Sequence, residues 1–347
     1  MRGLTTGNRC ASLPSRSIVS VFCHMNSAVL LVLTSLGSGV AVDCTPRSRA
    51  EVAARISEIL HIVRNDPECD GPIGLLVDRP TAKADHVRHA HRRCNASVAT
   101  KLNVDILSSR WGESAYSAMH AEALRQHTVL HLGSMRFVAQ QYWDLIVWDI
   151  FFKGAPQKPR YFFEAGARNG ILESNTHFFE RYLGWTGLLV EPSVLAECVL
   201  PYTRPRAQHV HGAFCRTPFL ARPFDPLPPG CDGEVRRDLQ ARMQCFSWTT
   251  LAARYEIGKI DLWSLDLDNE DEQVRVLTEM LGATQPSVIL IECRRPTCAA
   301  ILKQYGYHVL ILEDSGKHER VTAKAKGDGT LYGDVLAWRD TCAAWKA

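Results

Sequence analysis

Two glutamates in the middle of the chain, Glu164 and Glu191, have the chemistry and the setting to bind a ligand. Each closes a short apolar run, and Gly166 and Gly170 follow the first of them. Glycines let a backbone approach a ligand closely, and a carboxylate can accept hydrogen bonds from both hydroxyls of a ribose. The segment lacks a complete Gly-x-Gly-x-x-Gly, which disfavours a pyrophosphate-binding turn. A ribose ligand without bound phosphate, such as S-adenosylmethionine, fits better.

A strand, a glycine turn, a helix and a second strand are needed to bring these two acids together. The apolar runs Tyr161–Phe163 and Gly187–Val190 are the expected strands, and residues 174–183 have a helical pattern. In a doubly wound sheet the strand tips line the crevice in which nucleotides bind. The pattern therefore predicts a nucleotide-binding crevice between Glu164 and Glu191.

This stretch resembles the FkbM-type methyltransferases. In that family a motif of the form Phe-Val-Glu-Val-Gly-Ala-x-Asp-Gly is followed by Ser-Asn-Thr and then by Gly-Trp-x-Gly-Leu-Leu-x-Glu-Pro. The matching residues here are Glu164-Ala165-Gly166-Ala167, Gly170, Ser174-Asn175-Thr176, Gly184-Trp185, Gly187-Leu188-Leu189 and Glu191-Pro192. Asn169 departs from the acid that is usual in the family, and an amide donates hydrogen bonds as well as accepting them.

The resemblance implies that S-adenosylmethionine is the cofactor, with Glu164 beside its amino-acid end and Glu191 on its ribose. Ser174 is expected to cap the helix, where such side chains accept hydrogen bonds from exposed N–H groups. Asn175 is expected either to do the same or to face the cofactor. The full set of expected cofactor-binding residues is Glu164, Gly166, Ala167, Asn169, Gly170, Asn175, Glu191 and Asp266.

A second acidic pair, Asp266 and Asp268, ends the apolar run Ile260–Leu267. This run is similar to the family's Ile-Asp-x-Leu-x-Leu-Asp-x-Glu segment, with Asp268 in place of the glutamate. On a strand the two carboxylates point to the same face. Repulsion between the two carboxylates could raise the pKa of one of them and make it a general base. Alternatively, the pair could hold a divalent metal together with Asn269. Asp268 is the expected catalytic base and Asp266 the supporting acid, and the expected site contains no metal.

The alternation of strand and helix patterns from Tyr161 to Trp338 predicts a three-layer α/β fold. The resemblance implies a Rossmann-like class I methyltransferase fold, with helices on both faces of a mostly parallel seven-stranded sheet and an antiparallel last strand. We expect a leader over residues 1–41, a mostly helical accessory region over 42–133, and the FkbM-like methyltransferase domain over 134–347. Arg216–Arg242 has no periodicity and is expected to be a loop.

The first forty residues differ from the rest of the chain. They contain three arginines and no acid before Asp43, and Ile18–Val42 is mostly apolar. This predicts a cleaved signal peptide or a membrane anchor over residues 18–42, and an organelle transit peptide is the alternative. Of twelve cysteines, two lie in this leader and ten follow it. An even number of cysteines suits disulfides in the secretory pathway, either in a secreted protein or in the lumen of the Golgi or ER.

The composition bounds the function. The hydrophobic content of 46% suits a globular protein with a buried core. No block of lysine and arginine is long enough to follow a phosphate backbone, so no nucleic-acid partner is expected.

We expect a methyltransferase that O-methylates a sugar or other small hydroxyl compound, so its partner would be a small-molecule or glycan acceptor. The alternative is a non-catalytic, methyltransferase-like binding or trafficking protein of the secretory pathway. A glycosyltransferase is disfavoured, because Asp266-Leu267-Asp268 lies at a strand end rather than on a loop.

Overall fold

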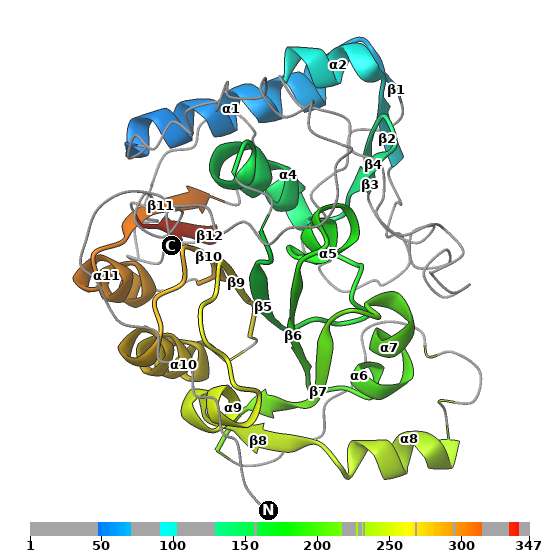
Figure 1. Cartoon of the computed structure of the whole chain (residues 1–347), viewed down its shortest axis with the longest axis vertical. Helices are drawn as coiled ribbons and strands as arrows, with labels where there is room; N and C mark the ends of the chain where they lie inside the picture. The colour runs from blue at the N-terminus through cyan, green and yellow to red at the C-terminus, as the bar shows by residue number, and fades with distance from the viewer. Residues whose placement is uncertain are drawn as a thin grey trace, which may run out of the picture. The chain divides into compact units, whose positions relative to one another are not determined.

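The structure is a computed structural model that describes residues 48–70, 91–102, 129–155, 158–216, 227, 231, 233–267, 269–293, 296–313 and 333–339. Val42–Ala347 forms one unit, built on an eight-stranded sheet and a smaller four-stranded sheet (Figure 1). The expected leader lies outside the described residues. Among the residues that are described, no helix is long and apolar enough to cross a membrane.

The large sheet has the predicted Rossmann-like character. Its strands are β5 (Tyr161–Ala165), β6 (Thr186–Glu191), β7 (Gln208–Phe214), β8 (Gln244–Phe246), β9 (Leu262–Leu265), β10 (Val288–Glu292), β11 (His308–Glu313) and β12 (Gly333–Trp338). They lie in the order β11-β12-β10-β9-β5-β6-β7-β8. Among these strands, β12 alone runs opposite to the others, which are parallel to one another. The predicted fold class is confirmed, and β8 adds an eighth strand at one edge.

Both faces of this sheet are buried, which explains the nearly continuous apolar runs of its strands. Successive side chains on a strand point to opposite faces. Phe162 and Leu189 therefore pack in one hydrophobic cluster, whereas Phe163 and Leu188 pack in the other. The two clusters are the interfaces between the sheet and its two helical layers.

The helices divide between these two layers (Figure 1). One layer holds α1 (Arg49–Asn65), α4 (Trp143–Val147) with the π-helical turn Trp148–Phe152, α5 (His177–Leu183), α6 (Leu195–Cys198) and α7 (Leu200–Thr203). The other holds α9 (Trp248–Arg254), α10 (Glu270–Ala283) and α11 (Pro296–Gln304). This arrangement is the predicted three-layer sandwich.

The N-terminal part of the unit packs onto the first of these layers. Ser48 and Glu51 form a capping box at the start of α1, and the helix buries Val52, Ile56, Ile59 and Val63 in the cluster that also contains Trp148. Arg55 Nε donates to Asp149 Oδ2 at 2.7 Å. The helix is therefore joined to the part of the unit that carries the large sheet by apolar packing and by an ion pair.

The small sheet begins in the expected accessory region. It consists of β1 (Cys69–Asp70), β2 (His91–Cys94), β3 (Val129–Leu132) and β4 (Met135–Phe137), in that order, and a short helix, α2 (Ala96–Lys101), follows β2. Cys69 and Cys94 form a disulfide between β1 and β2. The β3–β4 hairpin crosses the boundary expected between residues 133 and 134, and the division into domains stays a prediction.

The prediction of a loop over Arg216–Arg242 was wrong in part. Helix α8 (Gly233–Gln240) lies inside this range, and residues 217–226 lie outside the described part of the chain. An exposed helix needs no apolar stripe, and Val235 of α8 is 47% exposed. The apolar pattern of α8 is a single i, i+4 pair, Val235 and Leu239, which is too short to establish a helical period.

Candidate functional site

The carboxyl ends of the parallel strands meet at one edge of the large sheet. β5, β6, β9 and β10 end there and β12 begins there, so Glu292 and Asp334 are paired residues of neighbouring strands. Ala165, at the tip of β5, pairs with β6 on one side and with β9 on the other. Glu164 and Glu191, between which the sequence predicts a crevice, also lie at this edge.

The turn that follows β5 packs against the tip of β9. Gly166 has φ +84°, and a Cβ atom there would collide with the main-chain oxygen of Asp266. The N–H groups of Gly166 and Ala167 donate to Val190 O at 3.0 and 3.3 Å, and Asp266 N donates to Ala165 O at 3.1 Å. The close approach of three strand ends therefore requires glycine at position 166. The structure brings Gly166, Ala167 and Asp266 together, and their role in cofactor binding stays a prediction.

Asn169 and Gly170 shape the second half of this turn. Asn169 Oδ1 accepts hydrogen bonds from the N–H groups of Ile171 and Leu172 at 3.0 and 2.8 Å, an Asx turn. Gly170 has φ +79°, and a Cβ atom there would collide with the Arg204 side chain. The contacts described here give both residues a role in holding the turn.

Glu191 lies at the tip of β6 and is 5% exposed. Its Oε2 accepts from Arg168 N at 2.7 Å, and its Oε1 accepts from Ser193 N at 2.9 Å. Burial raises the pKa of Glu191, and these hydrogen bonds partly offset that increase. An ionised carboxylate has about four acceptor sites. Two backbone donors thus orient Glu191 and leave it able to accept more hydrogen bonds.

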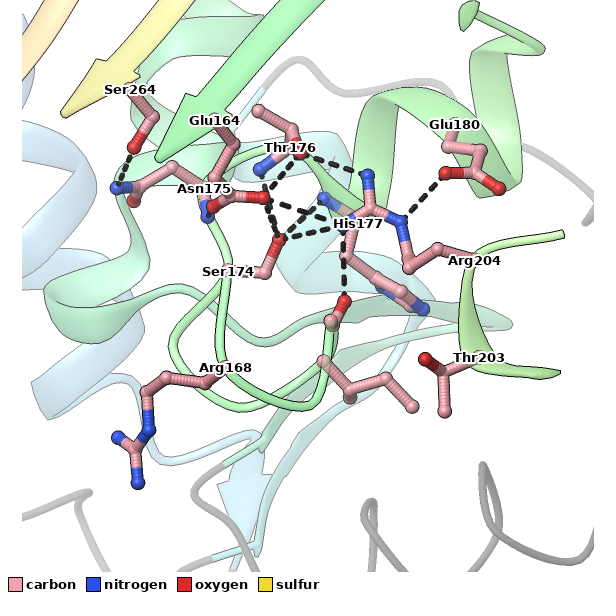
Figure 2. A network of polar contacts seen from close by, with 12 residues as sticks. Glu164, Arg168, Ser174, Asn175, Thr176, His177, Glu180, Thr203, Arg204 and Ser264 are labelled. Atoms are coloured by element: carbon pink, nitrogen blue, oxygen red, sulfur yellow. Dashed lines mark hydrogen bonds and ion pairs between the residues drawn. The ribbon is translucent and has the colours of Figure 1, made fainter. Parts of the chain in front are cut away.

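Glu164 is enclosed by its own chain, as Figure 2 shows, and is 3% exposed. Its carboxylate accepts from Thr176 Oγ1 (2.6 Å), Ser174 Oγ (2.8 Å), Asn175 N (2.9 Å) and Arg204 Nη1 (3.4 Å). These donors belong to the start of α5 and to the end of α7. Glu164 therefore fixes the residues at the beginning of α5. Its position at the end of an apolar run in the sequence did not indicate this structural role.

Ser174 and Asn175 take different roles at the start of α5. Ser174 Oγ accepts from His177 N, at the first residue of α5, at 3.1 Å, although Thr176 and not Ser174 occupies the N-cap position. Asn175 Nδ2 donates to Ser264 Oγ of β9 at 3.0 Å. Asn175 Oδ1 is buried and has no hydrogen-bond partner among the described residues. Asn175 thus presents a buried acceptor beside the tip of β9.

A cavity of about 40 Å³ lies over the tips of β9, β10 and β12. Its lining residues are Gln140, Trp143, Glu173, Asn175, Leu265, Asp266, Leu290, Ile291, Glu292 and Asp334. Asp266 and Asn175 are thus brought to the same cavity. Asp268, the expected base, lies outside the described residues.

Several residues of this cavity were not predicted from the sequence. Trp143 Nε1 donates to Asp334 Oδ2 at 2.6 Å, and Gln140 begins the turn that leads to Trp143. Glu292 ends an apolar run in the same way as Glu164 and Glu191. The same pattern, an acid at the end of a predicted strand, could therefore have identified it. No comparable local signal marks Gln140 or Trp143.

The polar residues around the cavity are mostly hydrogen-bond acceptors. The described lining contains four carboxylates (Glu173, Asp266, Glu292 and Asp334), two amides and no lysine or arginine. Carboxylates and amides suit ligands that carry hydroxyl or amino groups. Among the residues that the structure describes, no group of three or more His, Cys, Asp or Glu side chains is arranged to hold a metal ion.

Comparison with known proteins gave likenesses in structure only. No family model matches the chain, and no curated protein matches it in sequence.

Among solved structures, precorrin-6y C5,15-methyltransferase of Geobacter metallireducens matches at 10% identity and a TM-score of 0.31, over 58% of this chain and 92% of that one. CalS10 of Micromonospora echinaspora, an amino pentose methyltransferase solved with SAM bound, matches at 12% identity and a TM-score of 0.31. The match covers 57% of this chain and 91% of that one. Mitomycin 7-O-methyltransferase MmcR matches at 16% identity and a TM-score of 0.24. The match covers 54% of this chain and 50% of that one. At these identities and TM-scores the three neighbours carry no conclusion about what this chain binds.

Proposed function

We propose that this chain is an S-adenosylmethionine-dependent methyltransferase of the FkbM type. The observation that carries the proposal is the place of Glu191, a buried carboxylate at the tip of β6, oriented by two backbone N–H groups and next to the glycine turn after β5. Among the described strands of the large sheet, β12 is the antiparallel one and the last in sequence, as the family resemblance implies.

The polar groups at this edge fit such a cofactor. Ribose hydroxyls are donors, and Glu191 has acceptor sites beyond those used by its two backbone partners. An ammonium group is also a donor, and Asn175 Oδ1 is a buried acceptor with no partner among the described residues. Bound here, the cofactor would supply an activated methyl group. Glu191 and Asn175 would hold its two polar ends, beside Gly166, Ala167 and the rest of the turn.

We further propose that the methyl acceptor is a sugar or another small hydroxyl compound. The cavity beside Asp266 is lined by acceptor groups, which suit hydroxyl donors, and by the Trp143 ring. Methyl transfer requires mainly that the reacting groups be close and well oriented, and a hydroxyl acceptor also needs a base near its proton. Asp268 is the proposed base, and Asp266 the supporting acid.

Isothermal titration with S-adenosylhomocysteine tests the cofactor. We expect the wild-type protein to bind it and Glu191→Ala to bind it on the order of tenfold more weakly, because a hydrogen bond to a charged group is lost. Because burial raises the pKa of Glu191, binding should also weaken as the pH falls toward that raised value. Glu234→Ala, an exposed position on α8, is the control and should bind like wild type.

Absence of binding by the wild-type protein would refute the proposed cofactor. It would favour the alternative of a non-catalytic binding or trafficking protein that keeps the fold without turnover.

Incubation with labelled S-adenosylmethionine and a panel of glycans and small alcohols tests the acceptor. Transfer to a hydroxyl compound is expected, and Asp268→Asn should lower the rate without weakening cofactor binding. Undiminished transfer by Asp268→Asn would remove Asp268 from the mechanism and leave the methyltransferase proposal standing. If a matched panel of amines is methylated and none of the hydroxyl compounds is, the proposal of a hydroxyl acceptor is wrong.

We also propose that the protein matures in the secretory pathway. Eight cysteines form four disulfides, Cys69–Cys94, Cys198–Cys231, Cys215–Cys245 and Cys293–Cys298, and such bonds persist in oxidising compartments. Alkylation of the native protein before and after reduction, followed by mass spectrometry, should find these eight cysteines protected. If they react without reduction in protein isolated from its native source, the secretory proposal is wrong.

A further inference from the structure

Arg204 lies directly after α7, and its side chain is 0% exposed. Its guanidinium donates to Glu180 Oε2 (2.6 Å), Thr176 Oγ1 (2.8 Å), Gly170 O (3.0 Å), Ser174 Oγ (3.0 Å) and Glu164 Oε2 (3.4 Å), as Figure 2 shows in part. The same group lies 5.1 Å from the centroid of the Phe162 ring. One buried cation thus contacts the end of β5, the glycine turn and α5.

These partners form a sequence of contacts that ends at the cavity. Arg204 contacts the carboxylate of Glu164, and Oε1 of that carboxylate accepts from Asn175 N at 2.9 Å. The Asn175 side chain then reaches Ser264 of β9 and lines the cavity. The position of the Asn175 amide therefore depends on Glu164, and Glu164 is held partly by Arg204.

We propose that Arg204 is a positioning residue for the cofactor site, an inference that rests on the proposed function. It holds the glycine turn through Gly170 and holds Asn175 through Glu164, so that both are in place before the ligand binds. Arg204 does not line the cavity, and it acts only through these residues.

The planar guanidinium is what makes this arrangement possible. Its nitrogens point in fixed, divergent directions, so that one side chain reaches three segments at once. A lysine ammonium is a single point of charge, which could pair with Glu164 or Glu180 but could not keep all five contacts. Arg204→Lys therefore keeps the buried charge and removes the geometry.

A second buried arginine provides a matched control. Arg160 Nη1 contacts Asp261 Oδ1 at 2.9 Å, with the two side chains 3% and 7% exposed, and its guanidinium lies 5.4 Å from the centroid of the Phe152 ring. Arg160 precedes β5 and Asp261 precedes β9, so this pair lies at the opposite edge of the sheet from the cavity. Arg160→Lys disturbs a similar buried ion pair away from the site.

The test compares Arg204→Lys with Arg160→Lys in the full chain. Hydrogen–deuterium exchange of the unliganded protein should show faster exchange confined to residues 166–177 in Arg204→Lys, and not in Arg160→Lys. Titration with S-adenosylhomocysteine should show affinity on the order of tenfold weaker for Arg204→Lys, as expected when binding groups are misplaced, and affinity close to wild type for Arg160→Lys. Thermal unfolding of both variants measures their general loss of stability.

The outcomes separate this inference from the proposed function. If exchange over residues 166–177 rises equally in both variants, or if both lose affinity equally, Arg204 is only a stabilising residue and the inference is wrong. If wild type does not bind S-adenosylhomocysteine, the proposed function fails and so does a cofactor role for Arg204. The exchange data would then still decide whether Arg204 organises the turn.

Discussion

At the scale of single residues, Asp144 is an ionisable group buried close to the cavity. It is 0% exposed, and its carboxylate accepts from Val138 N, Ala139 N and Leu145 N at 2.8, 3.2 and 3.0 Å. These contacts span the turn in which Gln141 and Tyr142 adopt positive φ. Asp144 therefore stabilises an unfavourable backbone turn between two lining residues of the cavity, Gln140 and Trp143.

Asp144 should make stability depend on pH. Burial raises its pKa from 3.8 to about 7, despite the backbone hydrogen bonds, which lower it. The folded state therefore binds a proton more tightly than the unfolded state, and the free energy of unfolding should fall as the pH rises from about 4 to about 7. The change is on the order of a few kcal/mol, and Glu191, whose pKa burial also raises, contributes in the same direction.

Denaturant unfolding between pH 4 and 8 measures this effect. Asp144→Asn should reduce the pH dependence of the free energy of unfolding, and Ser57→Ala, at an exposed position of α1, is the control. An unchanged pH profile for Asp144→Asn would show that Asp144 does not titrate in this range.

At the scale of elements, the turn between β5 and α5 requires glycine for a reason beyond its dihedral angle. Gly166 and Gly154 both have positive φ, but a Cβ atom at Gly166 meets the Asp266 backbone, whereas at Gly154 nothing lies within 4 Å. Gly154→Ala should cost about 1–2 kcal/mol for the left-handed conformation. Gly166→Ala should cost about 1–3 kcal/mol more, because β5 and β9 must move apart.

Thermal and denaturant unfolding of the two glycine variants gives the comparison. Equal losses of stability would mean that the strand tips adjust without cost. Gly166→Ala should also weaken S-adenosylhomocysteine binding, since the displaced tip carries Asp266.

At the scale of the whole molecule, α1 and the small sheet share a hydrophobic core with the helices and strands of the large sheet. Ile56 and Ile59 are fully buried in the cluster that contains Trp148 and Trp338, and Arg55 pairs with Asp149. A fragment of residues 134–347 would expose this surface and would lose β3 from its hairpin with β4. It should therefore unfold at a lower temperature than a fragment of residues 42–347, or aggregate.

Differential scanning calorimetry of the two fragments measures this dependence. Ile56→Ala in the longer fragment should cost about 2–5 kcal/mol, as for other buried isoleucines, and Ser57→Ala, at an exposed position of the same helix, is the control. Equal unfolding temperatures for the two fragments would instead support an independent domain beginning at residue 134.

Much of the large sheet follows from local sequence. The strands of the sheet are buried on both faces, so they read as apolar runs, and acids such as Glu164 and Glu191 mark where these runs end. Glu164 and Glu191 lie at the predicted strand ends, and Gly166 lies in the predicted turn. Periodicity and turn chemistry act over a few residues, so they are visible in the sequence itself.

The partners of these residues depended on tertiary structure. Glu164 is held by Arg204, 40 residues further along the chain, and Trp143 contacts Asp334 across 191 residues. Such contacts arise when helices and strands pack into layers, and no local pattern records which distant side chains then meet. The sequence by itself determined where the strand tips and the glycine turn lie. Only the packed fold decided that Glu164 is enclosed, that Asn175 faces a cavity, and that Arg204 connects them, because these relations depend on distances between segments remote in the chain.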